Sequence, residues 1–288
     1  MTSCADYGRT RILGCGGSQR SGKDREVRFQ GDANFSSNVT WSLSPPVPGA
    51  NYGIDAPKLV QRFAVRGGLL VVFAAVLYIV NRRTSPGTAL ALALACGGIG
   101  LGFLATAGIM IWSSRIGKLR VRDEILNGIA WRGDETVLDL GCGRGLLLIG
   151  AAKRLKTSRA TGVDSWSAEN LSGNTAEAVM ENAKAEGVAD RIRLETSDLR
   201  KLPFGDKTFD VAVSGLAIHN IPVRDQRAKA LAEIVRVLKP GGRVAIFDLM
   251  YPGEYAKALG ELGLSDVKVS GYKFLWCLPG RIVTARKS

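Results

Sequence analysis

Two long apolar stretches stand out in the first half of the chain. Gly87 to Trp112 is 26 residues without a charge. As a helix it would be about 39 Å long, more than the roughly 30 Å of a bilayer's hydrocarbon core. Gly67 to Val80 adds 14 uncharged residues, and it reaches back to Phe63 if Arg66 extends toward the headgroups. We therefore predict a transmembrane hairpin over residues 55–112, with spans at about 64–80 and 87–112. A buried hairpin in a soluble fold is the alternative.

The start of the first span carries its own signal. Asp55, Ala56 and Pro57 predict a helix with Asp55 as the N-cap and the proline in the first turn. In the second span, Gly98 and Gly102 form a G-x-x-x-G pattern, which lets another helix approach closely. Self-association of the protein through these two glycines is a possible consequence.

From residue 113 on, short apolar runs alternate with segments that carry apolar residues at helical spacing. This alternation predicts an α/β domain over residues 113–288. Residues 1–54 show no sustained periodicity, and we expect a disordered or extended segment there. The predicted strands are 137–140, 160–164, 192–195, 209–221 with its exit, 243–248, 267–269 and 282–285, and the predicted helices are 113–130, 146–155, 174–186, 226–238 and 253–262.

The net charge of +13 is concentrated beside the apolar stretches. Residues 57–122 carry nine Lys and Arg and no Asp or Glu, which is typical of segments that flank membrane spans. We therefore expect a membrane partner and no nucleic-acid partner. The turn between the spans holds Arg82 and Arg83, against seven basic residues at the opposite ends of the two spans: Lys58, Arg62, Arg66, Arg115, Lys118, Arg120 and Arg122. This asymmetry predicts an integral membrane protein whose N-terminus and C-terminal domain face the cytoplasm.

The most informative motif lies in the α/β domain, where Val137 to Gly145 reads VLDLGCGRG. A short buried strand, a turn with Gly141, Gly143 and Gly145, and a helix form the first crossover of a Rossmann-like sheet. Glycines let a ligand approach the backbone. Asp139, two residues before the first glycine, would repel a pyrophosphate but suits a cationic ligand. The alternative is a tight strand–helix turn that binds nothing.

An acid followed by G-x-G-x-G resembles the first motif of class I S-adenosylmethionine-dependent methyltransferases. Later segments continue the match in order: Asp164 at the end of the second strand, Asp198-Leu199, the L-P-F run followed by F-D, and V-L-K-P-G-G-R before the fifth strand. The N-P-P-[YF] signature of amino-group methylation is absent, so the chain resembles the small-molecule, type 11-like branch. The resemblance implies a seven-stranded Rossmann-like sheet with helices on both faces, preceded here by the two-helix transmembrane hairpin.

The resemblance also implies a binding site for the cofactor S-adenosylmethionine. Asp164 lies 19 residues beyond Gly145, the spacing at which such folds place a carboxylate on the ribose hydroxyls. Trp166 could lie against the adenine or pack over a helix instead. His219 is the only histidine and the candidate general base. The five cysteines are scattered, and we expect neither a disulfide framework nor a metal site. The candidate cofactor-binding residues are Asp139, Gly141, Gly143, Gly145, Asp164, Asp198 (toward the adenine amino group), Leu199 (backbone beside the ring) and Ser214.

Two functions remain open from the sequence. The first is a membrane-anchored methyltransferase that acts on an unidentified small-molecule or lipid-like acceptor at the membrane surface. The second is a non-catalytic membrane module that binds S-adenosylmethionine for sensing or assembly. Asp139 and the L-K-P-G-G segment at the fifth strand argue against a third function, a nucleotide-dependent dehydrogenase, whose signature would be G-x-G-x-x-G.

Overall fold

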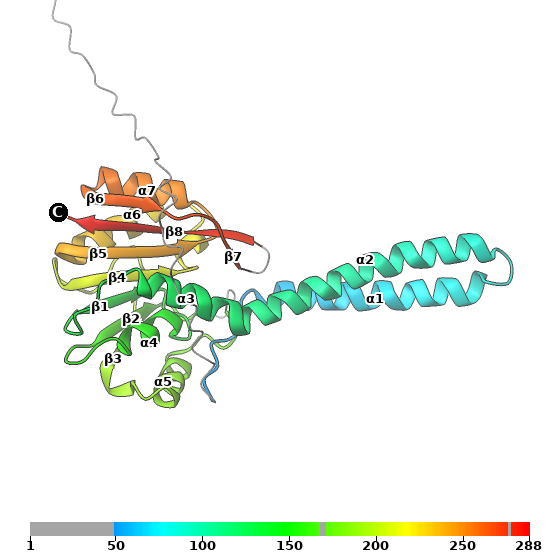
Figure 1. Cartoon of the computed structure of the whole chain (residues 1–288), viewed down its shortest axis with the longest axis horizontal. Helices are drawn as coiled ribbons and strands as arrows, with labels where there is room; N and C mark the ends of the chain where they lie inside the picture. The colour runs from blue at the N-terminus through cyan, green and yellow to red at the C-terminus, as the bar shows by residue number, and fades with distance from the viewer. Residues whose placement is uncertain (1–48, 168–170, 276–277) are drawn as a thin grey trace, which may run out of the picture.

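A mixed β-sheet forms the centre of the α/β domain in the computed structural model, which describes residues 49–167, 171–275 and 278–288 (Figure 1). The strand order is β3-β2-β1-β4-β5-β8-β6, in which β1 to β5 are parallel and β8 runs antiparallel to both of its neighbours. The strands on this path are β1 (Val137–Leu140), β2 (Ala160–Asp164), β3 (Ile192–Thr196), β4 (Phe209–Gly215), β5 (Leu238–Asp248), β6 (Leu264–Val269) and β8 (Leu278–Lys287).

The prediction of seven strands needs one correction. A short additional strand, β7 (Lys273–Leu275), pairs only with β8 and gives an eight-stranded sheet. Lys239–Gly242 was expected to separate the preceding helix from the fifth strand, but it lies within β5. Leu238 pairs with Phe209 of β4, and the pairing of β4 with β5 continues at Val211 after a shift in register. Both differences arise from cross-strand pairing, which local sequence patterns do not encode.

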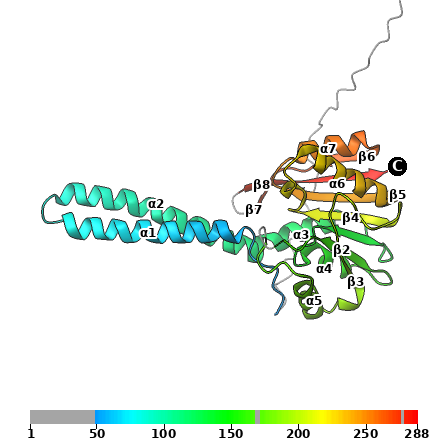
Figure 2. The same ribbon diagram turned by 180° about the vertical axis from the view of Figure 1, so that it is seen from behind.

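Helices cover both faces of the sheet (Figures 1 and 2). One apolar cluster joins one face to α3 (Lys118–Asn127), α4 (Leu146–Ala152) and α5 (Ala176–Ala185), and the other joins the opposite face to α6 (Arg224–Val237) and α7 (Pro252–Glu261). In the sheet, β2 and β3 lie on one side of β1, and β4 and β5 lie on its other side. The strand order therefore reverses between β1 and β4, and a crevice is expected where these two strands end.

The two apolar stretches form helices α1 (Pro57–Asn81) and α2 (Pro86–Trp112), which pack against each other and project from the domain (Figure 1). Both are long and apolar enough to cross a membrane, and most of their side chains are exposed. A Cβ added at Gly67 would lie 2.8 Å from the Gly100 carbonyl oxygen, so these two glycines allow the close packing. Gly98 and Gly102 face open space instead.

The boundaries of the hairpin differ from those predicted. Ala56, with φ of 46°, occupies the N-cap position of α1, and the cap has no side-chain hydrogen bond, so Asp55 is not the N-cap. At the other end α2 does not stop at Trp112. It continues through a π-helical turn, Ser113–Gly117, into α3, which makes one continuous helix of 42 residues, Pro86–Asn127.

The segment before α1 also contacts the domain. The expected disordered or extended segment, 1–54, lies largely outside the described residues. Its last part, however, binds α5: the Asn51 N–H donates to Oδ1 of Asn182 (2.7 Å), and the Tyr52 hydroxyl donates to Glu186. The chain is therefore fixed to the domain before it enters the hairpin.

Candidate active site

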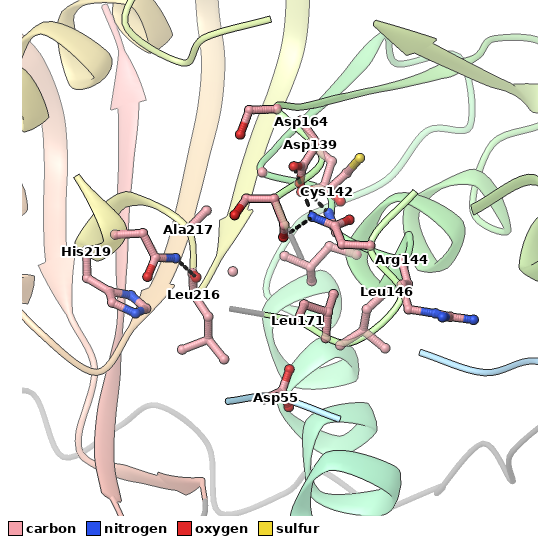
Figure 3. A pocket seen from close by; sticks show the side chains of 18 of the residues that line it. Asp55, Asp139, Cys142, Arg144, Leu146, Asp164, Leu171, Leu216, Ala217 and His219 are labelled. Carbon is pink, nitrogen blue, oxygen red and sulfur yellow. Dashed lines mark hydrogen bonds between the residues drawn. The ribbon is translucent and has the colours of Figure 1, made fainter. Parts of the chain in front are cut away.

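A cavity of about 820 Å³ lies where the parallel strands end, on the side of the sheet from which the hairpin leaves (Figures 1 and 3). It collects side chains from segments far apart in the chain. The glycine turn after β1 and the loops after β2, β3 and β4 supply most of its lining. The segment before α1, the helices α1, α3 and α4, and the end of β5 contribute other residues. Figure 3 shows Asp139 and Asp164 beside the glycine turn and His219 across from them.

The glycine turn is held by backbone hydrogen bonds and by one carboxylate. The N–H groups of Gly141 and Cys142 donate to the Val163 carbonyl oxygen, at 2.8 and 3.1 Å. Gly141 has φ of 68°, and a Cβ there would lie 2.2 Å from that of Ala217. Gly141 and Gly143 line the cavity, whereas Gly145 is the N-cap residue of α4 and lies outside the cavity lining. The predicted loop is thus formed, with Gly145 in a structural position.

Asp139 is the most unusual acid in the site. It is 1% exposed, and among the described residues neither carboxylate oxygen has a hydrogen-bond partner. Burial, together with the nearby Asp164, raises the pKa of Asp139 from 3.8 to about 8. A buried acid that lines a cavity without a partner is costly unless a ligand pairs with it. The site therefore fits a ligand that brings a cation, such as an ammonium group, to Asp139.

Asp164 already has protein partners. Its Oδ2 accepts from the Gly143 N–H (2.8 Å), and its Oδ1 accepts from the Trp166 N–H (2.7 Å) and the Asn174 side-chain amide (3.2 Å). The carboxylate lines the cavity while it holds the glycine turn in place. Trp166 lies outside the cavity lining and its indole N–H donates to the Thr196 hydroxyl (2.7 Å), whereas Ser165 lines the cavity.

The remaining predicted cofactor residues divide into two groups. Asp198 and Leu199 line the cavity. Asp198 forms an ion pair with Arg200, whose hydrogen bonds lower the pKa of the Asp198 carboxyl. Ser214 is fully buried and donates to the Leu140 carbonyl oxygen (2.8 Å), a contact that ties β4 to β1 and leaves Ser214 outside the cavity lining.

His219 lies on the turn after β4 and lines the same cavity. Its Nδ1 is 2.6 Å from Oδ1 of Asp248, which is 1% exposed. Oδ2 of Asp248 accepts from the His219 backbone N–H (3.1 Å) and from the Tyr255 hydroxyl (3.0 Å). The buried carboxylate of Asp248 thus lies against Nδ1 of His219, although this close contact lacks hydrogen-bond geometry.

Two kinds of site residue escaped sequence reasoning. Asp248 ends the predicted fifth strand, next to the strand that leads to His219, and this adjacency is the signal that could have identified it. Lys118 could not be identified from the sequence. It is buried, its Nζ donates to the carbonyl oxygens of Tyr52 (2.7 Å) and Gly53 (2.8 Å), and burial lowers its pKa.

Comparisons with known proteins show what this chain is similar to. Residues 137–242 match the family described as "Methyltransferase domain". A sterol 4-C-methyltransferase of Caenorhabditis elegans is 37% identical over 42% of this chain and 33% of its own length. A demethylmenaquinone methyltransferase of Lactiplantibacillus plantarum is 37% identical over 41% of this chain and 46% of its own. The crystal structure of an S-adenosylmethionine-dependent methyltransferase from Aquifex aeolicus has 20% identity and a TM-score of 0.46 over 58% of this chain and 89% of its own. This chain thus spans about a third to a half of the curated relatives described here.

Proposed function

We propose that this chain carries a class I S-adenosylmethionine-dependent methyltransferase domain, with S-adenosylmethionine as its cofactor, and that it methylates a small-molecule or lipid-like acceptor at a membrane surface. The observation that carries the proposal is the position of Asp139. A buried, unpartnered acid and a histidine whose Nδ1 lies beside a second buried acid line one cavity. The first suits the cationic donor, and the second suits removal of a proton from the acceptor.

Donor binding would rest on residues that already line the cavity. Asp139 would pair with the ammonium group, and the bare backbone of Gly141 and Gly143 would let the ligand approach. Asp164 would accept hydrogen bonds from the ribose hydroxyls with the lone pairs that its protein partners leave unused. Asp198 and Leu199 would border the adenine. Gly145 and Ser214 would support the site from behind.

The bound cofactor supplies an electrophilic methyl group on a sulfonium. The cavity brings the nucleophilic atom of the acceptor against it, which lowers the barrier by proximity. When bound, the cofactor would supply this methyl group to that atom and would keep the electron pair of its carbon–sulfur bond. Nε2 of His219 takes the proton that leaves the acceptor, while Asp248 stabilises the resulting imidazolium.

The hairpin supports a membrane location. Large apolar side chains on α1 and α2 are exposed, among them Leu69 at 65% and Leu94 at 67%. A soluble protein rarely exposes so large an apolar surface. Phe274 on β7 (72% exposed) and Tyr272 directly before this strand (64%) lie at the end of the sheet nearest the hairpin (Figures 1 and 2). Aromatic side chains at this position suit a membrane–water interface. The basic residues beside the spans support a cytoplasmic domain, and the outward-facing Gly98 and Gly102 leave self-association in the bilayer available.

The test is transfer of label from methyl-labelled S-adenosylmethionine by the full-length protein in detergent, supplied with membrane extract or soluble extract. The matched control is Asp139→Asn, which changes one buried group. Label in the organic phase, lost in the control, is the expected result. Donor binding by calorimetry without transfer would favour the non-catalytic module. Absence of both would refute the assignment.

A further inference from the structure

The hairpin contributes to the wall of the cavity. Lys58, Leu59 and Arg62, in the first two turns of α1, line the same cavity as Asp139 and His219. These residues lie at the end of α1 nearest the domain, next to the apolar part of the helix that we propose spans the membrane (Figure 1). One side of the cavity is therefore formed by the part of the chain that would lie at the membrane–water interface.

The basic side chains around the cavity differ in their partners. Lys118 is bound by carbonyl oxygens of the segment before α1, and Arg200 by Asp198. Arg144 donates to the carbonyl oxygens of Asn51 (2.5 Å) and Gly173 (3.0 Å). Two more basic side chains that line the cavity also have partners: Arg122 forms an ion pair with Asp123, and Lys58 has an interaction partner as well. These side chains thus have structural contacts.

Arg62 differs from all of them. It is exposed, and the described part of the chain provides it with no hydrogen bond, ion pair or ring contact. A guanidinium presents a planar set of donors that matches a carboxylate or a phosphate. At this position it faces both the cavity and the region where lipid headgroups would lie.

We propose, on the basis of the proposed function above, that Arg62 recognises the anionic head of an amphiphilic acceptor. The head, a carboxylate or phosphate, pairs with the guanidinium, and the reacting atom lies between α1 and His219. The apolar tail stays in the bilayer beside α1, where Leu59 (40% exposed) continues the apolar surface of the helix. The hairpin then delivers the acceptor as well as anchoring the enzyme.

Arg66 provides a matched control. It lies one turn further along α1, is also exposed, and does not line the cavity. If the basic residues act only on anionic lipid surfaces or on topology, replacement of either arginine should have the same effect. If Arg62 recognises the acceptor, the two replacements should differ.

The experiment is calorimetric titration of the full-length protein in phosphatidylcholine nanodiscs, saturated with S-adenosylhomocysteine. The probes are dodecyl phosphate, ethyl phosphate and dodecanol, and empty nanodiscs correct for partitioning. We expect dodecyl phosphate to bind more tightly than the other two probes. Arg62→Ala should weaken this binding about tenfold or more, Arg62→Lys should weaken it less, and Arg66→Ala should change it less than about twofold.

Equal losses in the two alanine variants, dodecanol binding as tight as dodecyl phosphate, or no probe binding would each overturn the proposal. Failure of S-adenosylhomocysteine to bind is a separate result. It would refute the proposed function itself, since that titration depends on Asp139 and the glycine turn rather than on Arg62.

Discussion

Replacement of Asp139 by asparagine should stabilise the ligand-free protein and weaken donor binding at the same time. The folded-state pKa of about 8 lies above the ordinary value of 3.8. Folding therefore opposes ionisation of this group: the associated stability is fully present below about pH 4 and is lost progressively up to about pH 8. At pH 7 the loss amounts to about 4 kcal/mol.

Asparagine cannot ionise and avoids this loss, but its buried amide lacks partners, which costs about 1–3 kcal/mol. We expect a net gain of about 1–3 kcal/mol at pH 7, seen as a rise of several degrees in Tm for a domain of this size. The assay is thermal unfolding of the full-length protein in detergent from pH 5 to pH 9. The advantage of Asp139→Asn should grow with pH and level off near pH 8.

Donor binding should change in the opposite direction. Loss of the charge partner of the ammonium should weaken S-adenosylhomocysteine binding by about 30-fold or more. In the wild-type protein, binding at pH 7 should release about 0.9 of a proton as Asp139 ionises, measured by calorimetry in buffers of different ionisation enthalpy. A variant with unchanged affinity, together with no proton release in the wild type, would refute the assignment of Asp139 to the cation.

Further outcomes follow from other contacts. Asp248→Asn should lower kcat about 100-fold or more and leave the Kd of the donor unchanged, because it removes the negative charge beside His219 Nδ1; stopped-time label transfer and calorimetry distinguish the two effects. Gly141→Ala should abolish donor binding and lower Tm, since its Cβ has no space; an unchanged thermal transition would contradict the geometry. Gly100→Leu should separate α1 from α2 and lower Tm, whereas Gly98→Leu should leave the hairpin intact and reduce only self-association, as measured by cross-linking in detergent.

Much of the fold was predictable from the sequence because its signals are local. The uncharged lengths of α1 and α2, the alternation of strands and helices, and the glycine turn after β1 each depend on residues close together in the chain. Gly141 and Gly143 have positive φ, as the glycines of the G-x-G-x-G motif that predicts the turn allow. Asp139 could be identified because its spacing from the glycines is fixed.

The tertiary structure decided which of the candidate residues form the site. Ser214 lies on the predicted strand, but its hydroxyl donates a hydrogen bond to the Leu140 carbonyl oxygen. Asp198 lines the cavity, but its carboxylate forms an ion pair with Arg200. The pairing of His219 with Asp248 joins residues 29 positions apart. It arises because β4 and β5 are neighbours in the sheet and end at the same edge. Sequence spacing determines periodicity and turns, whereas burial and partner choice depend on which distant segments the sheet brings together.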